Sequence, residues 1–267
     1  MDMQRTPENH YVALLLPSFR KYPDAPVFLP YIGRDDSWGR VTYRDLEQRL
    51  VVAQAHWRNT LAPLNLQPRD VVGFWLVSFT VAMSMCLTSI CRNRVARLTG
   101  RKLSDLINTI AVCSLGYVPQ YFSGYFSNVA VVLDLLNKSG GKAMILDPSF
   151  YSNLSPPNYE TSPIERFKTL EDSDMERLIA QSDQSSQPKL ELSSVAAVAP
   201  DDIAALFHSS GTTSGLPKII PNTFKMIRSM VSEKWPNMVV KPAHGRQPVV
   251  NTLGSVAHIG SFHCTFS

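Results

Sequence analysis

The most informative stretch of the chain is LFHSSGTTSGLPKIIPNT, residues 206–223. A short apolar run enters a loop of small hydroxyl residues and glycines, which leaves through Pro217 and Lys218 into another apolar pair. Glycine lets backbone N–H groups approach phosphate oxygens, serine and threonine hydroxyls add short donors, and lysine adds a point charge for outer phosphates. The stretch therefore has the chemistry of a triphosphate-binding loop. A plain hydroxyl-rich turn between strands is the alternative interpretation.

This loop does not follow the common P-loop pattern. That pattern has a glycine, four further residues and then Gly-Lys-Ser/Thr, opening a helix. Counted from Gly211, the second glycine position holds Leu216, and Lys218 is followed by Ile219. The two isoleucines after the lysine predict extended chain, so a different kind of phosphate loop is indicated.

The segments before the loop alternate between helical and strand-like patterns. Thr42 and Asp45 predict a capping box at the start of the first helix, and Gly116 and the Gly140–Gly141 pair are plausible helix stops. Strand, helix and strand in alternation predict an α/β fold with a largely parallel buried sheet and flanking helices. The expected helices are 42–58, 102–116 and 127–141, and the expected strands are 71–76, 142–147 and 203–207.

Composition narrows the class of protein. Hydrophobic residues make up 44% of the 267 residues and charged residues 18%, which is typical of a globular chain. The net charge of +4 is too small to indicate a nucleic-acid partner, and we expect none. The start of the chain lacks a basic segment followed by a long apolar core, so we expect a cytoplasmic protein. The four cysteines show no metal-type clustering, so free thiols are expected and no metal-ligating residues are assigned.

Two segments depart from the α/β pattern. Residues 152–200 are rich in serine and proline around one short amphipathic piece, and are interpreted as a surface excursion outside the core. Residues 71–91 contain no charged side chain and are long enough to cross a bilayer as a helix. A membrane-anchored protein through 71–91 is therefore one open alternative, although the neighbouring α/β pattern argues against a membrane partner.

The loop resembles the phosphate loop of the AMP-forming adenylating superfamily, which includes acyl-CoA synthetases and the adenylation domains of peptide synthetases. The family pattern is Ser/Thr-Ser-Gly-Thr/Ser-Thr-Gly-x-Pro-Lys, and Ser214 is one residue more than this spacing. Further similarity lies in VTYRDLEQRL, in KLSDLINTIAVCSLGYVPQYFS and in VNTLGSVAHIGSF, and spans most of residues 25–267. The matching loop residues are Ser209, Ser210, Gly211, Thr212, Thr213, Gly215, Leu216, Pro217 and Lys218.

The resemblance implies a reaction and a set of roles. A carboxylic acid would be activated by ATP as an acyl-adenylate, with Mg²⁺ screening the phosphates and pyrophosphate as product. A thiol of CoA, or phosphopantetheine on a carrier-protein domain, would then accept the acyl group. Lys218 and Thr213 would act in catalysis, and His258 and Gly260 would line the pocket for the acid. The residues implied in binding the ATP phosphates are Ser209, Ser210, Gly211, Thr212, Thr213, Gly215 and Lys218.

The chain also departs from the family. The family has a Tyr-Gly-x-Thr segment, an Asp that binds the ribose and a C-terminal lysine, and none of these has a counterpart in residues 1–267. Residues 1–267 are therefore interpreted as a partial AMP-binding domain, truncated and inactive alone. Residues 77–98 interrupt the family spacing, and we hypothesise that they are an atypical insert, a translated intron. A pseudoenzyme or interaction protein that retains the fold is the alternative function. Whether the chain is an enzyme, and which acid it would use, stays open.

Overall fold

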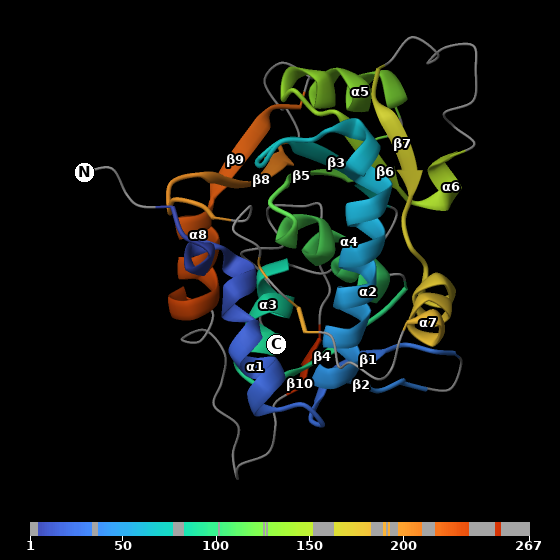
Figure 1. Cartoon of the computed structure of the whole chain (residues 1–267), viewed down its shortest axis with the longest axis vertical. Coiled ribbons are helices and arrows are strands. Elements are labelled where there is room, and N and C mark those ends of the chain that lie inside the picture. The colour runs from blue at the N-terminus through green and yellow to red at the C-terminus, as the bar shows by residue number, and fades with distance from the viewer. Residues whose placement is uncertain are drawn as a thin grey trace.

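The structure is a computed structural model of the chain, and two sheets with their helices form most of the fold (Figure 1). The six-stranded sheet has the order β7-β6-β3-β5-β8-β9, and the smaller sheet has the order β10-β4-β1-β2. The residues that the structure describes are 5–33, 37–76, 83–100, 102–124, 126, 128–151, 163–182, 189–190, 192, 197–209, 217–234 and 249–251.

The larger sheet confirms the predicted α/β class with a largely parallel sheet. Strands β7, β6, β3, β5 and β8 run parallel to one another, and β9 pairs antiparallel with β8 at the edge. Its strands are β3 (Val71–Leu76), β5 (Val118–Ser123), β6 (Ala143–Leu146), β7 (Glu165–Lys168), β8 (Ile203–His208) and β9 (Ile219–Thr223).

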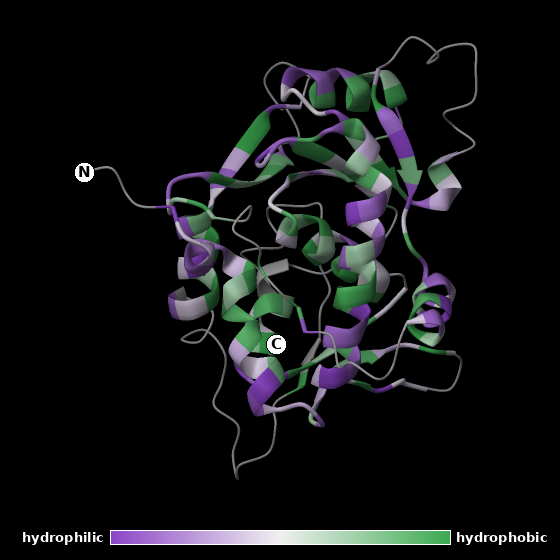
Figure 2. Ribbon diagram, viewed as in Figure 1, coloured by the Kyte–Doolittle hydropathy of each residue, from purple (hydrophilic) through white to green (hydrophobic). Residues whose placement is uncertain are grey.

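Helices cover this sheet on both faces. α5 (Val129–Lys138) lies on one face, and α2 (Tyr43–Leu61) and α4 (Lys102–Ser114) lie on the other (Figure 1). Because side chains alternate along a strand, Trp75 packs in the cluster on the α5 side, whereas Phe74 and Leu76 pack with α2 and α4. The central strands are accordingly mainly hydrophobic, whereas α2 alternates between hydrophilic and hydrophobic residues (Figure 2).

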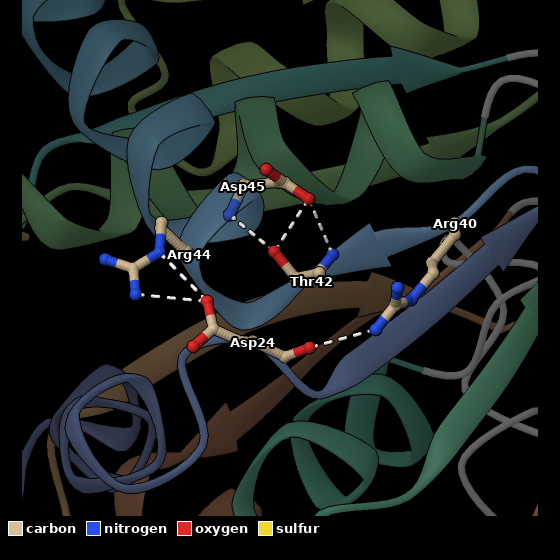
Figure 3. A network of polar contacts seen from close by, with 5 residues as sticks. All are labelled: Asp24, Arg40, Thr42, Arg44 and Asp45. Carbon is tan, nitrogen blue, oxygen red and sulfur yellow. Dashed lines mark hydrogen bonds and ion pairs between the residues drawn. The ribbon is translucent and has the colours of Figure 1, made fainter.

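The predicted capping box at the start of α2 is confirmed. The Asp45 amide donates to Thr42 Oγ1 at 3.2 Å, and the Thr42 amide donates to Asp45 Oδ2 at 2.9 Å. Next to it, Arg44 donates through Nε and Nη2 to one carboxylate oxygen of Asp24, and Arg40 donates to the Asp24 backbone carbonyl (Figure 3). These contacts satisfy the Asp45 amide in the first turn of α2 and tie the helix to the turn at residues 23–24, before the strand of residues 26–30.

Glycines terminate α5 and allow it to lie close to the sheet. Gly140 has φ = 72°, a left-handed conformation that glycine adopts without a steric cost, and it follows Ser139, the C-cap of the helix. A Cβ placed on Gly73 of β3 would lie 2.9 Å from a methyl carbon of Leu136. The end of α5 is therefore seated against β3, which determines where residues 138–140 lie relative to the neighbouring strands.

The smaller sheet was not predicted. β1 (Pro26–Pro30) pairs antiparallel with β2 (Val41–Thr42) and parallel with β4 (Val95–Leu98), which pairs in turn with β10 (Val249–Asn251). α3 (Met83–Cys91) precedes β4, and the Tyr43 hydroxyl of α2 donates to the Ile90 carbonyl at 2.8 Å. The described part of the 77–98 segment thus lies within the fold. The intron hypothesis concerns the transcript and stays a prediction.

The 152–200 segment is more than a surface excursion where it is described. β7 adds a parallel strand to the edge of the larger sheet, and α7 (Asp172–Gln181) packs on α2. Met175 and Leu190 are buried in the main core, so the interpretation needs correction for these residues. Their serine-rich and proline-rich flanks concealed a contribution to the core. The other short elements are α1 (Leu16–Lys21), α6 (Pro148–Tyr151), α8 (Phe224–Ser229), a π-helical turn (Met230–Lys234) and 3₁₀ turns at Pro7–Asn9, Tyr11–Leu14 and Ala62–Leu64.

The described part of the uncharged stretch 71–91 consists of strand β3 and the nine-residue helix α3. Among the residues that the structure describes, no helix is long and apolar enough to span a membrane.

Candidate functional site

The candidate phosphate loop joins β8 to β9. The two strands pair antiparallel up to His208 opposite Ile219, and the Ser209 amide donates to the Lys218 carbonyl at 3.0 Å. These bonds hold together the two ends of the loop, which we call the loop neck (residues 208–209 and 218–219). The turn residues between them, 210–216, lie outside the described part of the chain.

Two predicted site residues can be placed. Ser209 is half-buried at the end of β8, and the side chain of Lys218 is exposed at the start of β9. The other predicted residues lie outside the described part of the chain, so their roles stay predictions. They are Ser210, Gly211, Thr212, Thr213 and Gly215 in the loop, and His258 and Gly260 in the expected acid pocket.

The loop neck lies at the edge of the sheet where ligands are expected. β6, β3, β5 and β8 are parallel, so their carboxyl ends meet at one edge, and open α/β sheets bind ligands outside that edge. Asp147 follows β6 there, and its carboxylate accepts the Ser149 amide at 2.9 Å. Asn128 caps α5 by accepting the Ala130 amide at 3.0 Å. The neck therefore opens onto an edge that carries further polar groups.

The ring of His208, which belongs to the loop neck, is buried. Its Nδ1 lies 2.9 Å from the Tyr121 carbonyl oxygen, and its Nε2 lies 3.0 Å from Nε2 of Gln120. Phe122 stacks on the ring with centroids 4.7 Å apart, and Phe126 meets it edge-on. Burial lowers the pKa of His208 below its ordinary value, and the bond to Tyr121 opposes part of that change. His208 is consequently neutral at pH 7.

Sequence reasoning did not single out His208 as a site residue. The usable signal was its position at the end of a buried strand, one residue before the loop, because a histidine there must place two polar nitrogens in an apolar interior.

A cavity of about 310 Å³ lies beside the same strands. Val71, Val118 and Ile203, the first residues of β3, β5 and β8, form part of its wall, and Arg69 and Lys138 are among its charged lining residues. Both cations have partners, because Arg69 pairs with Asp202 at 3.1 Å and Lys138 with Asp134 at 2.6 Å. The remaining lining residues are Ser139, Leu206, Ile219 and Pro221.

No metal site emerges from the described residues, among which no three His, Cys, Asp or Glu side chains are grouped to hold a metal ion. Cys91 and Cys113 are free thiols, as expected. Burial raises the pKa of Cys91 and of Cys113 to about 12, so both stay protonated at neutral pH.

No family model matches the chain. Among curated proteins, it is 29% identical over 130 residues to the AMP-binding domain-containing enzyme iboA of Amanita muscaria (strain Koide BX008). That alignment covers 48% of this chain and 23% of iboA. The chain thus matches less than a quarter of this relative's length.

Solved structures share the fold. The N-terminal subdomain of Klebsiella oxytoca NpsA superposes with a TM-score of 0.51 at 15% identity, over 86% of this chain and 44% of that one. The nonribosomal peptide synthetase FmoA3 (S1046A), in its α-methyl-L-serine-AMP bound form, gives a TM-score of 0.53 at 18% identity. This match covers 88% of this chain and 20% of FmoA3. The fold is therefore that of adenylation N-terminal subdomains, and the resemblance to a part of the AMP-forming adenylating superfamily is confirmed.

Proposed function

We propose that this chain, which resembles the N-terminal part of AMP-forming adenylating enzymes, supplies the phosphate loop for ATP-dependent activation of a carboxylic acid. The supporting observation is the loop neck, where a bond from Ser209 to Lys218 closes a hydroxyl-rich and glycine-rich turn. The neck stands at the carboxyl edge of a parallel sheet. The substrate class, a small carboxylic acid, comes from the resemblance.

The chemistry of the described donors fits the outer phosphates of ATP. The exposed ammonium group of Lys218 is a compact charge that phosphate oxygens accept well, and the Ser209 hydroxyl stands at the opposite end of the loop. We expect Mg²⁺ to bind together with the phosphate oxygens of ATP, because Mg²⁺ usually keeps several waters and combines substrate phosphates with one or two carboxylates. The loop residues Thr212 and Thr213 complete the proposed donor set.

In the proposed reaction a carboxylate oxygen of the acid attacks the α-phosphorus of ATP. The bond from that phosphorus to the bridging oxygen breaks, and its electron pair leaves with pyrophosphate. Lys218 would stabilise the negative charge that develops on the leaving group, and the loop would hold the phosphates in line. A thiol of CoA or of a carrier-protein phosphopantetheine would accept the acyl group in a later step.

Pyrophosphate exchange tests this function. The purified chain is incubated with ATP, Mg²⁺, labelled pyrophosphate and pooled carboxylic acids, and label in ATP is measured. In contrast to the expectation from the sequence that residues 1–267 are inactive alone, the proposal predicts exchange. It also predicts that Lys218→Ala lowers this exchange by about 100-fold or more, because a positioned charge at the leaving group is lost. Lys225→Ala, which removes an exposed lysine of α8, is the matched control and is expected to retain exchange.

A non-catalytic protein that retains the fold is the second candidate. It would keep the fold and the loop neck of the first candidate without the adenylation step. A folded chain that binds Mg²⁺–pyrophosphate through Lys218 but shows no exchange with any acid would support this candidate. A folded chain that neither exchanges nor binds pyrophosphate would overturn the proposed function.

A further inference from the structure

We propose that His208 is the positioning residue of the phosphate loop, holding the loop neck to β5 and to the end of α5 through both of its ring nitrogens. This inference rests on the proposed function, because it concerns the affinity of the same loop for phosphate groups. His208 itself lies below the loop and is not proposed to touch a ligand.

The hydrogen bonds around His208 can have one direction only. A backbone carbonyl accepts and never donates, so Nδ1 of His208 must carry the proton that points to the Tyr121 oxygen. Nε2 of the neutral ring is then an acceptor, and it receives a hydrogen from the Gln120 amide nitrogen. That nitrogen also donates to the Leu135 carbonyl at 3.2 Å, which confirms the orientation of the amide.

The chain of bonds continues into α5. Oε1 of Gln120 accepts a short bond from the Ser139 hydroxyl, which also lies 2.8 Å from the Leu136 carbonyl. Gln120 is fully buried, so each of these groups would lose solvation without its partner. One connected path therefore joins the last residue of β8 to β5 and to the C-terminal end of α5.

The position of His208 gives this path its effect on the loop. In the pairing of β5 with β8, Gln120 lies opposite Leu206. His208 lies two residues after Leu206, where β8 ends and the loop begins, and its ring bonds to the Tyr121 carbonyl of β5. The next residue, Ser209, makes the bond that closes the neck. A ring bonded at both nitrogens and stacked on Phe122 restricts the starting direction of the loop.

Two variants separate the hydrogen bonds from the packing. His208→Phe keeps an aromatic ring for Phe122 and Phe126 but removes both hydrogen bonds. His208→Asn retains an amide N–H that can reach the Tyr121 carbonyl as Nδ1 does, and is the rescue variant. Gln120→Met removes the donor to the ring at nearly constant size, and serves if the phenylalanine variant does not fold. Thermal unfolding of each variant verifies that the fold is retained.

The first readout is amide hydrogen exchange at Ser209, whose N–H closes the neck. We expect exchange about tenfold faster in His208→Phe than in the wild type, with amides of α2 unchanged and with His208→Asn, which keeps only the bond to Tyr121, about threefold faster. The second readout is the affinity for Mg²⁺–pyrophosphate by calorimetry. We expect it about tenfold weaker in His208→Phe and about threefold weaker in Gln120→Met and in His208→Asn, because both of these lose the bond between Gln120 and the ring position but keep a donor to Tyr121.

The outcomes are distinguishable. Unchanged Ser209 exchange and unchanged pyrophosphate affinity in a folded His208→Phe would overturn the positioning role. Equal losses in the phenylalanine and asparagine variants would also overturn it, because a general loss of packing would then explain them. A wild-type chain that binds no pyrophosphate overturns the proposed function, while the Ser209 exchange still decides whether His208 holds the neck.

Discussion

The chain buries two histidines in its described residues, and they are held in opposite tautomers. Nδ1 of His10, before the 3₁₀ turn Tyr11–Leu14, accepts the Val12 amide at 3.2 Å, and its other nitrogen bonds to the Cys113 carbonyl. Nδ1 of His208, at the loop neck, donates to a carbonyl. The backbone partner of each ring selects the tautomer, and the same residue type serves two different tasks.

The surroundings of the two rings differ as well. His10 lies 4.8 Å from the ring of Phe224, and Arg228 donates to its backbone carbonyl at 3.3 Å, so it fastens the N-terminal segment to α8. His208 is linked to Gln120 and through it to Ser139, and it stands beside a loop. We infer that the first histidine stabilises the fold, whereas the second also controls the geometry of the site.

Acidification is expected to have the largest effect and to act on both histidines. Burial lowers the pKa of His10 to about 3 and lowers that of His208 below its ordinary value. The unfolded chain takes up these protons near pH 6.5, so the stability contribution is complete above that pH and falls as the pH decreases. Below pH 6.5, each buried ring lowers the free energy of unfolding by about 1.4 kcal/mol per pH unit until the pH reaches its folded-state pKa. For His10 this loss is about 3 kcal/mol between pH 6.5 and 4.5.

Urea unfolding between pH 7 and pH 4.5, followed by tryptophan fluorescence, measures this dependence. His208→Asn cannot titrate and should show a shallower loss of stability than the wild type. His56→Asn, at a half-buried position on α2, should change the slope less. Identical slopes for the wild type and His208→Asn would show that His208 carries no proton-linked stability.

A second prediction separates folding from function. His10→Ala removes two hydrogen bonds and the ring contacts with Tyr11 and Phe224, so it should lower the free energy of unfolding by about 2 kcal/mol. Its affinity for Mg²⁺–pyrophosphate, measured under conditions where the variant is folded, should match the wild type. A matching loss of affinity would place His10 in the control of the site and remove the contrast with His208.

The smallest expected effect is the energetic coupling between Gln120 and His208, whose side chains are hydrogen-bonded to each other. Gln120→Met should lower the free energy of unfolding by about 1 kcal/mol, because Nε2 of His208 and the Leu135 carbonyl lose a donor. Combined with His208→Phe, it should cost about 0.5–1 kcal/mol less than the sum of the two single changes. Denaturant unfolding of the four proteins gives this coupling energy. Strict additivity would mean that the two side chains act independently.

Much of the larger sheet could be predicted, because its signals are local. The Thr42–Asp45 capping box, the helical period before Gly116 and Gly140, and the apolar run 71–76 each lie within a few residues of sequence. The structure confirms α2, α4, α5, β3, β6 and β8 at these places. At the site, the closed neck between Ser209 and Lys218 fits the predicted loop, whereas the roles of its turn residues stay predictions.

The missed elements depend on distant partners. β4 lies between β1 and β10, which come from residues 26–30 and 249–251, and none of these short strands has a distinctive pattern of its own. β7 was missed because three of its four residues are charged, so this edge strand has no apolar alternation. The burial of Met175 likewise arises from the packing of α7 on α2.

The amino-acid order alone was enough to predict the α/β class and the resemblance to adenylating enzymes, and it predicts a phosphate-binding loop at residues 209–218, since each of these depends on neighbouring residue types. Folding was needed to bring the ring of His208 against Tyr121 and Gln120, which lie almost 90 residues earlier in the chain. A hydrogen bond requires two groups within about 3 Å, and parallel strands achieve this between segments that the sequence keeps far apart.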